Sequence, residues 1–288
     1  MIPFILSIFS SIIIFVIFKL FKKFKIDTFQ AIVFNYFMAG IIGISLYGNT
    51  WNNAALEQNG WMVFSLLTSF LFIFLFFTMG RSSQENGVAS TSIAVKMSMA
   101  FSLVILIVYH SEVPSVLKIT GIVLAFLGVL LVSLPEKKAT EKSRYIWMLI
   151  VLFFGSGALD FMLNYVQENK LEILSPSLFT SFTMLVAGVI GTAILVFRIV
   201  KGKSKLAGKN IIAGLILGIP NFFSIYFLLL SYTTTGWTDS TVLALTNVSV
   251  VLLSAMFGII LFRERMTKIK IIGLIAALLA ITTLYIAQ

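Results

Sequence analysis

The segment GVASTSIAVKMSMAFSLVILIVYHSEVPSVLKITGIVLAFLGVLLVSL, residues 87–134, contains two apolar runs separated by the polar break His110-Ser111-Glu112. Apolar runs of this length on either side of a short polar break predict a helical hairpin that crosses a membrane twice. A related segment lies at 239–286, so the two copies align at an offset of 152 positions. The identical positions are Ser102, Ile107, Glu112, Lys118, Ile119, Gly121, Ala125 and Leu127, which align with Ser254, Ile259, Glu264, Lys270, Ile271, Gly273, Ala277 and Leu279.

The two copies differ at a charged position, because Lys96 in the first copy aligns with Val248 in the second. A helix that began after Lys96 would have about 14 residues, or about 21 Å, which is too short to cross a bilayer core of about 30 Å. Lys96 is therefore expected inside the membrane. A lysine there costs roughly 2.5–3.5 kcal/mol and marks a substrate site, an ion pathway or a water-lined cavity. The alternative is a purely structural ion pair.

The composition is that of an integral membrane protein. Of the 288 residues, 59% are hydrophobic and 11% are charged, which is too apolar for a soluble domain of this length. The absence of cysteine excludes disulfides, thiolate metal sites and cysteine nucleophiles. The first residues lack a basic segment and a cleavage site, so Met1 to Leu20 is expected to be a retained helix rather than a signal peptide.

The apolar runs predict an all-α membrane protein with ten transmembrane helices. Each run is close to the roughly 20 residues that one membrane crossing requires, and ten crossings leave no room for a soluble domain. The expected helices are 2–20, 29–47, 61–79, 88–109, 114–134, 145–166, 175–197, 210–232, 240–262 and 267–287.

Basic residues gather in alternate loops. All but three of the 21 Lys and Arg residues lie in or beside the loops that follow the odd-numbered expected helices, the exceptions being Lys96, Lys118 and Lys170. Because cytoplasmic loops carry an excess of Lys and Arg, this distribution predicts cytoplasmic basic loops and external termini. The net charge of +10 then reflects membrane topology and does not indicate a nucleic-acid partner.

A charged stretch that begins at Pro135 divides the ten helices into two sets of five. The predicted organisation is a first five-helix repeat at residues 1–135, a cytoplasmic linker at 136–144 and a second five-helix repeat at 145–288. Because five is odd, two homologous halves cross the membrane in opposite directions. This is the inverted-repeat plan of many secondary transporters, in which the substrate site lies between the halves near the midplane.

Four glycines support this duplication. An offset of 148 places Gly40 and Gly43 on Gly188 and Gly191, which relates the second expected helix to the seventh. A simpler interpretation also accounts for them, because small residues let membrane helices pack closely.

The segment around Glu264 and its fainter copy resemble a known family. The residues that carry the likeness are Leu261-Phe262-Arg263-Glu264-Arg265-Met266-Thr267 followed by Ile272-Gly273-Leu274-Ile275, and Glu112-Val113 followed by Gly121-Ile122-Val123-Leu124. They resemble the EamA-type branch of the drug/metabolite transporter (DMT) superfamily, and the likeness extends over the whole chain. Two features depart from the family pattern. The family usually has glycine before the glutamate, where this chain has Ser111 and Arg263, and often proline in the ninth helix, where this chain has Thr246-Asn247.

The resemblance implies a transporter of a small polar metabolite, such as an amino acid, with export as the expected direction. It implies a multi-pass protein of the cell membrane, which in bacteria is the inner membrane. It also implies cytoplasmic termini, opposite to the orientation that the basic loops predict.

The sixth expected helix offers a counter-ion for Lys96. Phe153, Gly157, Asp160 and Asn164 follow helical spacing and share one face. At 1.5 Å per residue Asp160 lies about 10 Å deeper than Lys96, so direct contact requires helix tilt or an extended lysine. Asn164 is interpreted either as a site residue or as an interhelical hydrogen-bonding group.

Three further asparagines, Asn35, Asn221 and Asn247, fall near the middle of the second, eighth and ninth expected helices. Asn221 follows Pro220, and a proline there frees a backbone carbonyl that a cavity can use. Each asparagine alone is an ordinary packing contact, but together with one cation and one anion they would form a pocket for an uncharged or zwitterionic solute. The predicted substrate-binding residues are Lys96, Asp160, Asn164, Asn35, Asn221 and Asn247.

These observations favour a secondary active transporter that works by alternating access, and not an enzyme. The alternatives are an intramembrane enzyme acting on a lipid-soluble substrate, with Asp160 as acid or base, or a passive channel. The sequence lacks a phosphate-binding glycine-lysine loop, so ATP hydrolysis by that route is excluded.

No metal or cofactor is expected, because the single histidine, His110, has only Glu112 as a nearby ligand partner in sequence. Burial favours the neutral forms of Lys96 and Asp160 while their attraction favours the charged forms, so the pair could exchange protons. The expected partners are therefore a small-molecule substrate, coupled protons and the lipid bilayer.

Overall fold

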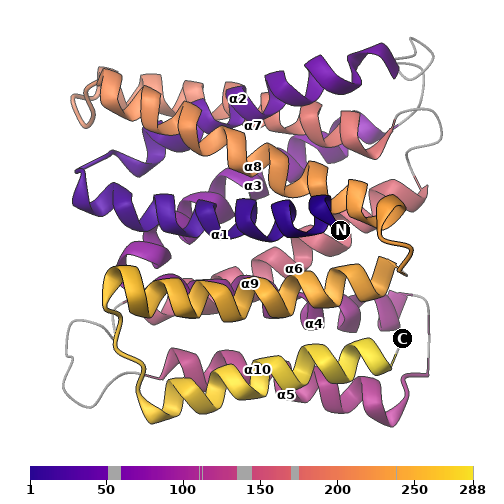
Figure 1. The fold of residues 1–288 in the computed structure, drawn as a ribbon. Helices are drawn as coiled ribbons and strands as arrows, with labels where there is room; N and C mark the ends of the chain where they lie inside the picture. The colour runs from indigo at the N-terminus through magenta and orange to yellow at the C-terminus, as the bar shows by residue number, and fades with distance from the viewer. Residues whose placement is uncertain are drawn as a thin grey trace.

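The computed structural model describes residues 1–50, 60–109, 111, 113–134, 145–169, 175–237 and 239–287. These residues form ten α-helices and one short 3-10 helix, which confirms the predicted all-α membrane fold. Within the described part, nine helices are long and apolar enough to cross a membrane, and α5 is a shorter apolar helix. The elements are α1 (Ile2–Lys23), α2 (Thr28–Tyr47), η1 (Gly48–Thr50), α3 (Trp61–Glu85), α4 (Val88–Tyr109), α5 (Val116–Ser133), α6 (Ile146–Asn169), α7 (Pro176–Val200), α8 (Gly208–Thr234), α9 (Asp239–Phe262) and α10 (Lys268–Ile286) (Figure 1).

The helices run between two ends of the bundle. One end carries both chain termini and is called the terminal end (Figure 1). The opposite end, called the basic end, carries the turns that follow α1, α3, α7 and α9. Lys22 and Lys23 are exposed in the last turn of α1, and Lys201 and Lys203 are exposed after α7. Basic residues that are far apart in the sequence therefore gather at one end of the described structure.

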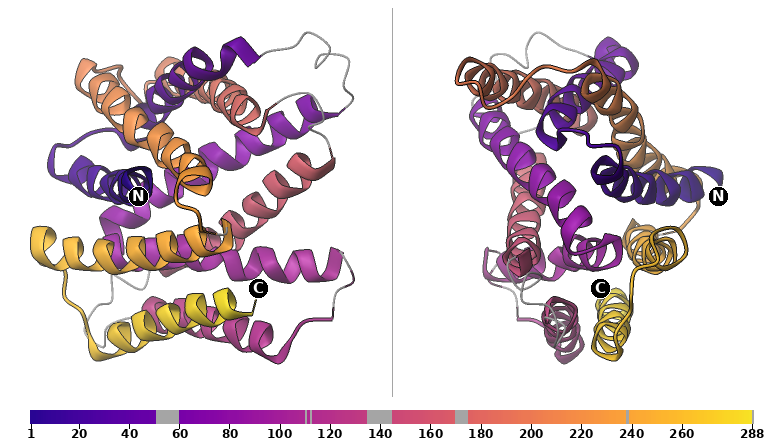
Figure 2. Two further views of the ribbon diagram at one scale, coloured as in Figure 1. Left: turned by 45° about the vertical axis from the view of Figure 1, so that its right-hand side comes forward. Right: turned by 90° about the vertical axis from the view of Figure 1, so that its left-hand side faces the viewer.

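The two copies of the hairpin lie against each other, α5 on α10 and α4 on α9 (Figures 1 and 2). The contact of α5 with α10 is close because both helices contribute a glycine. A Cβ atom added to Gly121 would lie 2.6 Å from Leu284 Cγ, and one added to Gly273 would lie 2.7 Å from Val132 Cγ2. Gly121 and Gly273 are aligned positions of the two copies, so the repeat places the same small residue at equivalent contacts.

The four glycines that suggested the second duplication lie where α2 packs on α7. A Cβ atom on Gly40 would lie 2.6 Å from Leu185 of α7, and one on Gly191 would lie 2.9 Å from Val33 of α2. Gly43 faces Ser181 and Gly188 faces Phe37 in the same interface. Each pair thus allows its helix to approach the other, as expected for small residues in membrane helices.

The two departures from the family's glycine share an unusual backbone. Ser111 has φ 53° and Arg263 has φ 51°, both in the left-handed region. This conformation favours glycine because a Cβ atom crowds the carbonyl there, at a cost of roughly 1–2 kcal/mol. The backbone geometry therefore explains why the family pattern has glycine at these positions.

Equivalent helices of the two predicted halves pack against equivalent neighbours. Helix α1 packs on α8 and α9, and α6, its counterpart, packs on α3 and α4. The predicted linker at 136–144 lies outside the described residues, and the division into repeats 1–135 and 145–288 stays a prediction.

Candidate functional site

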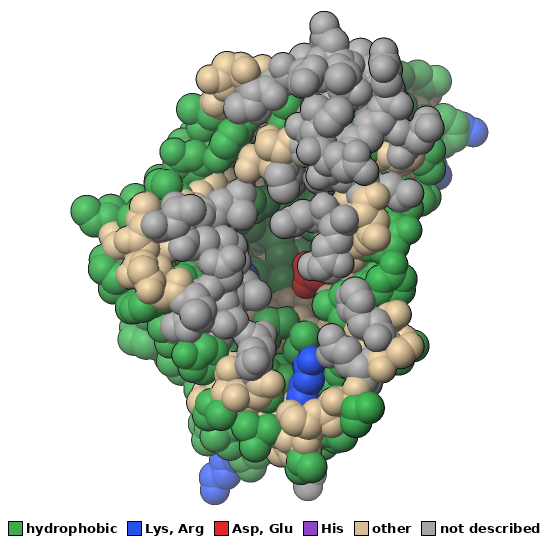
Figure 3. All heavy atoms as spheres, turned by 90° about the vertical axis from the view of Figure 1, so that its right-hand side faces the viewer, with side chains coloured by type: hydrophobic (Ala, Val, Ile, Leu, Met, Phe, Trp, Pro, Cys, Tyr) green, Lys and Arg blue, Asp and Glu red, His purple; other side chains and the backbone are tan. Residues whose placement is uncertain are grey.

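A cavity of about 650 Å³ lies between α1, α3, α4, α6, α8 and α9. It lies toward the terminal end, where the surface of the molecule is hollowed and an acidic side chain is visible within the hollow (Figure 3). Most of its wall is apolar. The polar residues that line it are Ser11, Lys96, Ser98, Ser102, Ser156, Asp160, Ser224 and Asn247.

Lys96 of α4 and Asp160 of α6 both line this cavity. Lys96 is half-buried, and the Asp160 side chain is exposed although it lies within the bundle, because it faces the cavity. Helix α6 approaches α4 closely at Gly157, where a Cβ atom would lie 2.6 Å from the Ser98 carbonyl oxygen. The residues predicted to share one face of α6 therefore have different surroundings, since Gly157 faces α4 whereas Asp160 faces the cavity.

The Asp160 carboxylate is weakly held by its neighbours. Ser98 Oγ lies 3.4 Å from Asp160 Oδ2, but the same hydroxyl donates to the Val95 carbonyl oxygen at 2.6 Å. A hydroxyl has one proton to donate, so the shorter contact dominates. Among the described residues, ion pairs within 4.0 Å join Lys19 to Glu264 and Lys22 to Glu85, and Lys96 and Asp160 form no such pair. Both charges are therefore available to a solute.

Asn247 of α9 is the third predicted residue that lines the cavity. Its amide nitrogen contacts the sulfur of Met99 at 3.6 Å. A thioether is a weak acceptor, so this contact leaves the amide free to exchange it for a stronger one.

The other predicted asparagines do not join this group. Asn35 in α2 and Asn221 in α8 are buried and are not among the residues that line the cavity. Both polar side-chain atoms of Asn35, and the amide nitrogen of Asn221, have no hydrogen-bond partner among the described residues. The side chain of Asn164 lies outside what the structure describes. A binding role for these three residues stays a prediction.

The serines and aromatic residues of the cavity were not predicted from the sequence. The aromatic residues that line the cavity are Phe15, Phe72 and Phe76. One signal was available in α4, because Met99, Leu103 and Leu106 follow Lys96 at helical spacing and also line the cavity. A second signal was available in α6, where Ser156 precedes Asp160 by four residues. For Ser11 in α1 and Ser224 in α8, the same helix holds no predicted site residue that lines the cavity.

A bundle of apolar helices around a cavity that holds two opposite charges without a direct ion pair is characteristic of a membrane transporter. The chain belongs to the EamA-like transporter family, whose model matches residues 142–286. The family is part of the DMT superfamily, so the protein is a multi-pass membrane transporter of the DMT type.

Two known proteins align with nearly the whole chain. A protein of Haemophilus influenzae, itself uncharacterized, is 27% identical over an alignment of 288 positions that covers 98% of this chain and 96% of that protein. A protein known from a crystal structure has a TM-score of 0.57 and 10% sequence identity, with 96% of each chain covered. At that identity the likeness establishes a shared fold.

Among the described residues, no three His, Cys, Asp or Glu side chains form a group that could hold a metal ion. The polar groups that the described residues contribute to the cavity are one lysine, one aspartate, an amide and hydroxyl groups.

Proposed function

We propose that this protein is a secondary active transporter of a small zwitterionic metabolite, such as an amino acid, and that it works by alternating access. The observation that carries the proposal is the placement of Lys96 and Asp160 in one cavity without a direct ion pair between them. The Lys96 ammonium group would bind the carboxylate of the solute, and the Asp160 carboxylate would bind its ammonium group. Charge-assisted hydrogen bonds of this kind are the strong ones.

The rest of the cavity supports a small organic solute. Asn247 and the serine hydroxyls supply neutral donors and acceptors, and the aromatic and aliphatic wall accommodates apolar parts of the solute. The volume of about 650 Å³ falls within the range of small-molecule sites, roughly 300–1,000 Å³.

Alternating access is supported by the similar packing of the two predicted halves. In transporters built from inverted repeats, one repeat rocks against the other around a central site. Export, location in the bacterial inner membrane and coupling to protons are parts of the proposal that follow from the family resemblance and from Asp160 as a titratable group in the cavity.

Solute transport by purified protein in liposomes tests the proposal. A screen of metabolites by thermal shift would first identify a ligand, because a compound that binds only the folded state raises the melting temperature. The labelled ligand should then enter liposomes saturably, and entry should accelerate when the lumen is preloaded with unlabelled ligand. Lys96→Ala should abolish both the thermal shift and the transport.

Two results would overturn it. A chemically altered product without transport would favour the intramembrane enzyme, for which Asp160 would serve as acid or base. Flux that does not saturate and does not respond to preloading would favour the passive channel.

A further inference from the structure

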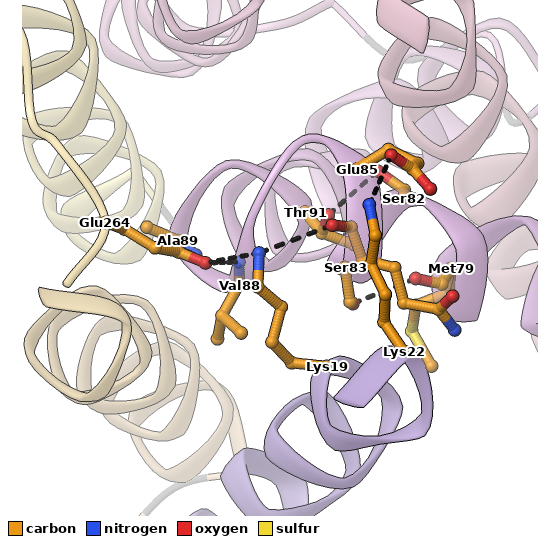
Figure 4. A network of polar contacts seen from close by, with 11 residues as sticks. Lys19, Lys22, Met79, Ser82, Ser83, Glu85, Val88, Ala89, Thr91 and Glu264 are labelled. Atoms are coloured by element: carbon orange, nitrogen blue, oxygen red, sulfur yellow. Dashed lines mark hydrogen bonds and ion pairs between the residues drawn. The ribbon is translucent and has the colours of Figure 1, made fainter. Parts of the chain in front are cut away.

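Three polar groups from distant parts of the chain meet at the basic end (Figure 4). Lys19 Nζ, near the end of α1, lies 3.0 Å from Glu264 Oε1, in the turn between α9 and α10. The same carboxylate accepts hydrogen bonds from the backbone amides of Val88 at 2.9 Å and Ala89 at 3.5 Å, at the start of α4. Lys19 Nζ also lies 3.4 Å from the Gln84 carbonyl oxygen of α3.

This contact caps one helix with a side chain from the other predicted half. The first amides of a helix lack partners within it and carry the positive end of the helix dipole, so a carboxylate there is stabilising. The backbone leaves room for it, because Cβ atoms added to Gly87 or Gly258 would each lie 2.7 Å from Glu264 Oε2. Glu264 also donates its own amide to the Gly258 carbonyl oxygen at 3.0 Å, which holds the turn in place.

The contact lies at the basic end, within a few helical turns of the cavity. Lys19 follows the cavity-lining Phe15 by four residues on α1, or about 6 Å along the helix axis. Val88 precedes the cavity-lining Lys96 by eight residues on α4, or about 12 Å. Helices α1, α3, α4 and α9 all line the cavity, and they or their adjoining turns converge at Glu264.

We infer that Glu264 is a gating residue: its contacts with Lys19 and the start of α4 close the cavity at the basic end and break in each transport cycle. The inference rests on the proposed alternating access, because a carrier must part its halves at the closed end to release solute there. The side chains of Lys19 and Glu264 are 20% and 14% exposed, so water can hydrate both when they separate. A fully buried pair would lack this compensation and would resist opening.

The neighbouring ion pair supplies a matched control. Lys22 Nζ lies 2.9 Å from Glu85 Oε2 at the same end, with side-chain exposures of 57% and 17%. This pair joins α1 to α3 within the first predicted half and does not reach the second. Its loss should therefore leave the opening of the halves unchanged.

Distances between spin labels test the gate without any solute. The chain has no native cysteine, so labels can be attached at Lys23→Cys on α1 and Lys268→Cys at the start of α10, both exposed positions near the contact. The unaltered gate should give mainly one short distance. Glu264→Gln and Lys19→Met should each raise the ratio of long to short distances roughly tenfold, the change expected from loss of a charge-assisted hydrogen bond. Glu85→Gln should leave the distribution unchanged.

The outcome separates this inference from the proposed function. Failure to find a transported solute would count against the proposed function and would leave the distance result intact. An unchanged distribution in a cooperatively melting Glu264→Gln or Lys19→Met protein would overturn the gate, as would an equal change in Glu85→Gln. Loss of cooperative melting in both gate variants would make the contact a structural cap and would also overturn it.

Discussion

Lys96 on α4 and Asp160 on α6 line the same cavity, yet the lysine nitrogen and the carboxylate oxygens of the aspartate are not within 4.0 Å of each other. A structural ion pair would be expected to close this distance, because an uncompensated charge away from water is costly. Separation across a cavity instead leaves both charges accessible to water or to a solute. Substitutions at these two positions should therefore change transport without a matching change in stability.

Charge removal in the cavity should abolish transport and spare the fold. For Lys96→Ala we expect transport to fall roughly 10- to 150-fold, since each charged contact to a solute contributes about 1.5–3 kcal/mol. The double variant Lys96→Met with Asp160→Leu loses two such contacts and should fall further. The melting temperature should change by no more than about 5 °C. A structural pair predicts the opposite result, in which single variants lose stability and the double apolar variant restores both stability and activity.

Proton coupling should depend on Asp160. In liposomes with an imposed pH difference, the rate of the unaltered protein should vary with pH, because a carboxylate in the cavity can take up and release a proton. Asp160→Asn keeps the shape of the side chain and cannot titrate, so its residual rate should be independent of pH. Ser98→Ala removes the hydroxyl that bonds Val95 at 2.6 Å and contacts Asp160 at 3.4 Å, but it leaves the carboxylate in place and should keep the dependence. A pH-dependent Asp160→Asn protein would place the coupling group elsewhere.

The orientation in the membrane can be determined with single cysteines, because the chain has none of its own. Val113, between α4 and α5, is 97% exposed and is therefore a suitable position for the label. An impermeant thiol reagent added to intact cells should label Val113→Cys and spare Lys203→Cys at the basic end. This pattern follows from the excess of Lys and Arg in cytoplasmic loops. The reverse pattern would support the orientation implied by the family resemblance.

Close packing of α8 on α2 should make Gly214 intolerant of any side chain. A Cβ atom at Gly214 would overlap the carbonyl oxygen of Ala31, a backbone atom that cannot rotate away. Gly214→Ala should therefore destabilise the protein by about 1–3 kcal/mol, measured as a lower melting temperature. Gly208→Ala is the matched control, because a Cβ atom there has nothing within 4 Å. Equal melting temperatures for the two variants would contradict the interface.

The left-handed backbone at Arg263 predicts a stabilising substitution. Arg263→Gly should raise the free energy of unfolding by about 0.5–1 kcal/mol, because relief of the left-handed strain outweighs the greater flexibility of glycine in the unfolded chain. Arg265→Gly removes the same charge at a residue without a positive φ, so it should give no such gain. A lower melting temperature for Arg263→Gly than for Arg265→Gly would show that the flexibility of glycine outweighs the relief of strain.

The helices of this protein were predictable from the sequence because the hydrophobic signal for a membrane helix is local. A run such as 88–109 is apolar over the length of one crossing, and that property does not depend on what the helix packs against. The same holds for the intramembrane position of Lys96, which follows from helix length, and for the repeat, which follows from the alignment of residues such as Gly121 and Gly273. The basic loops likewise predicted the segregation of charge to one end.

Only the tertiary structure decided which polar groups share a cavity, because the rotation of each helix about its axis is set by packing against neighbours. Asn247 lines the cavity, whereas Asn35 and Asn221 lie outside its lining, although all three fall near the middle of their helices. The contact of Glu264 with the start of α4 joins residues 176 positions apart, and Gly87 before α4 and Gly258 near the end of α9 permit the approach. Glu264 belongs to a motif in the sequence, but its partners could not be predicted, because the contact depends on where two separate segments end in space.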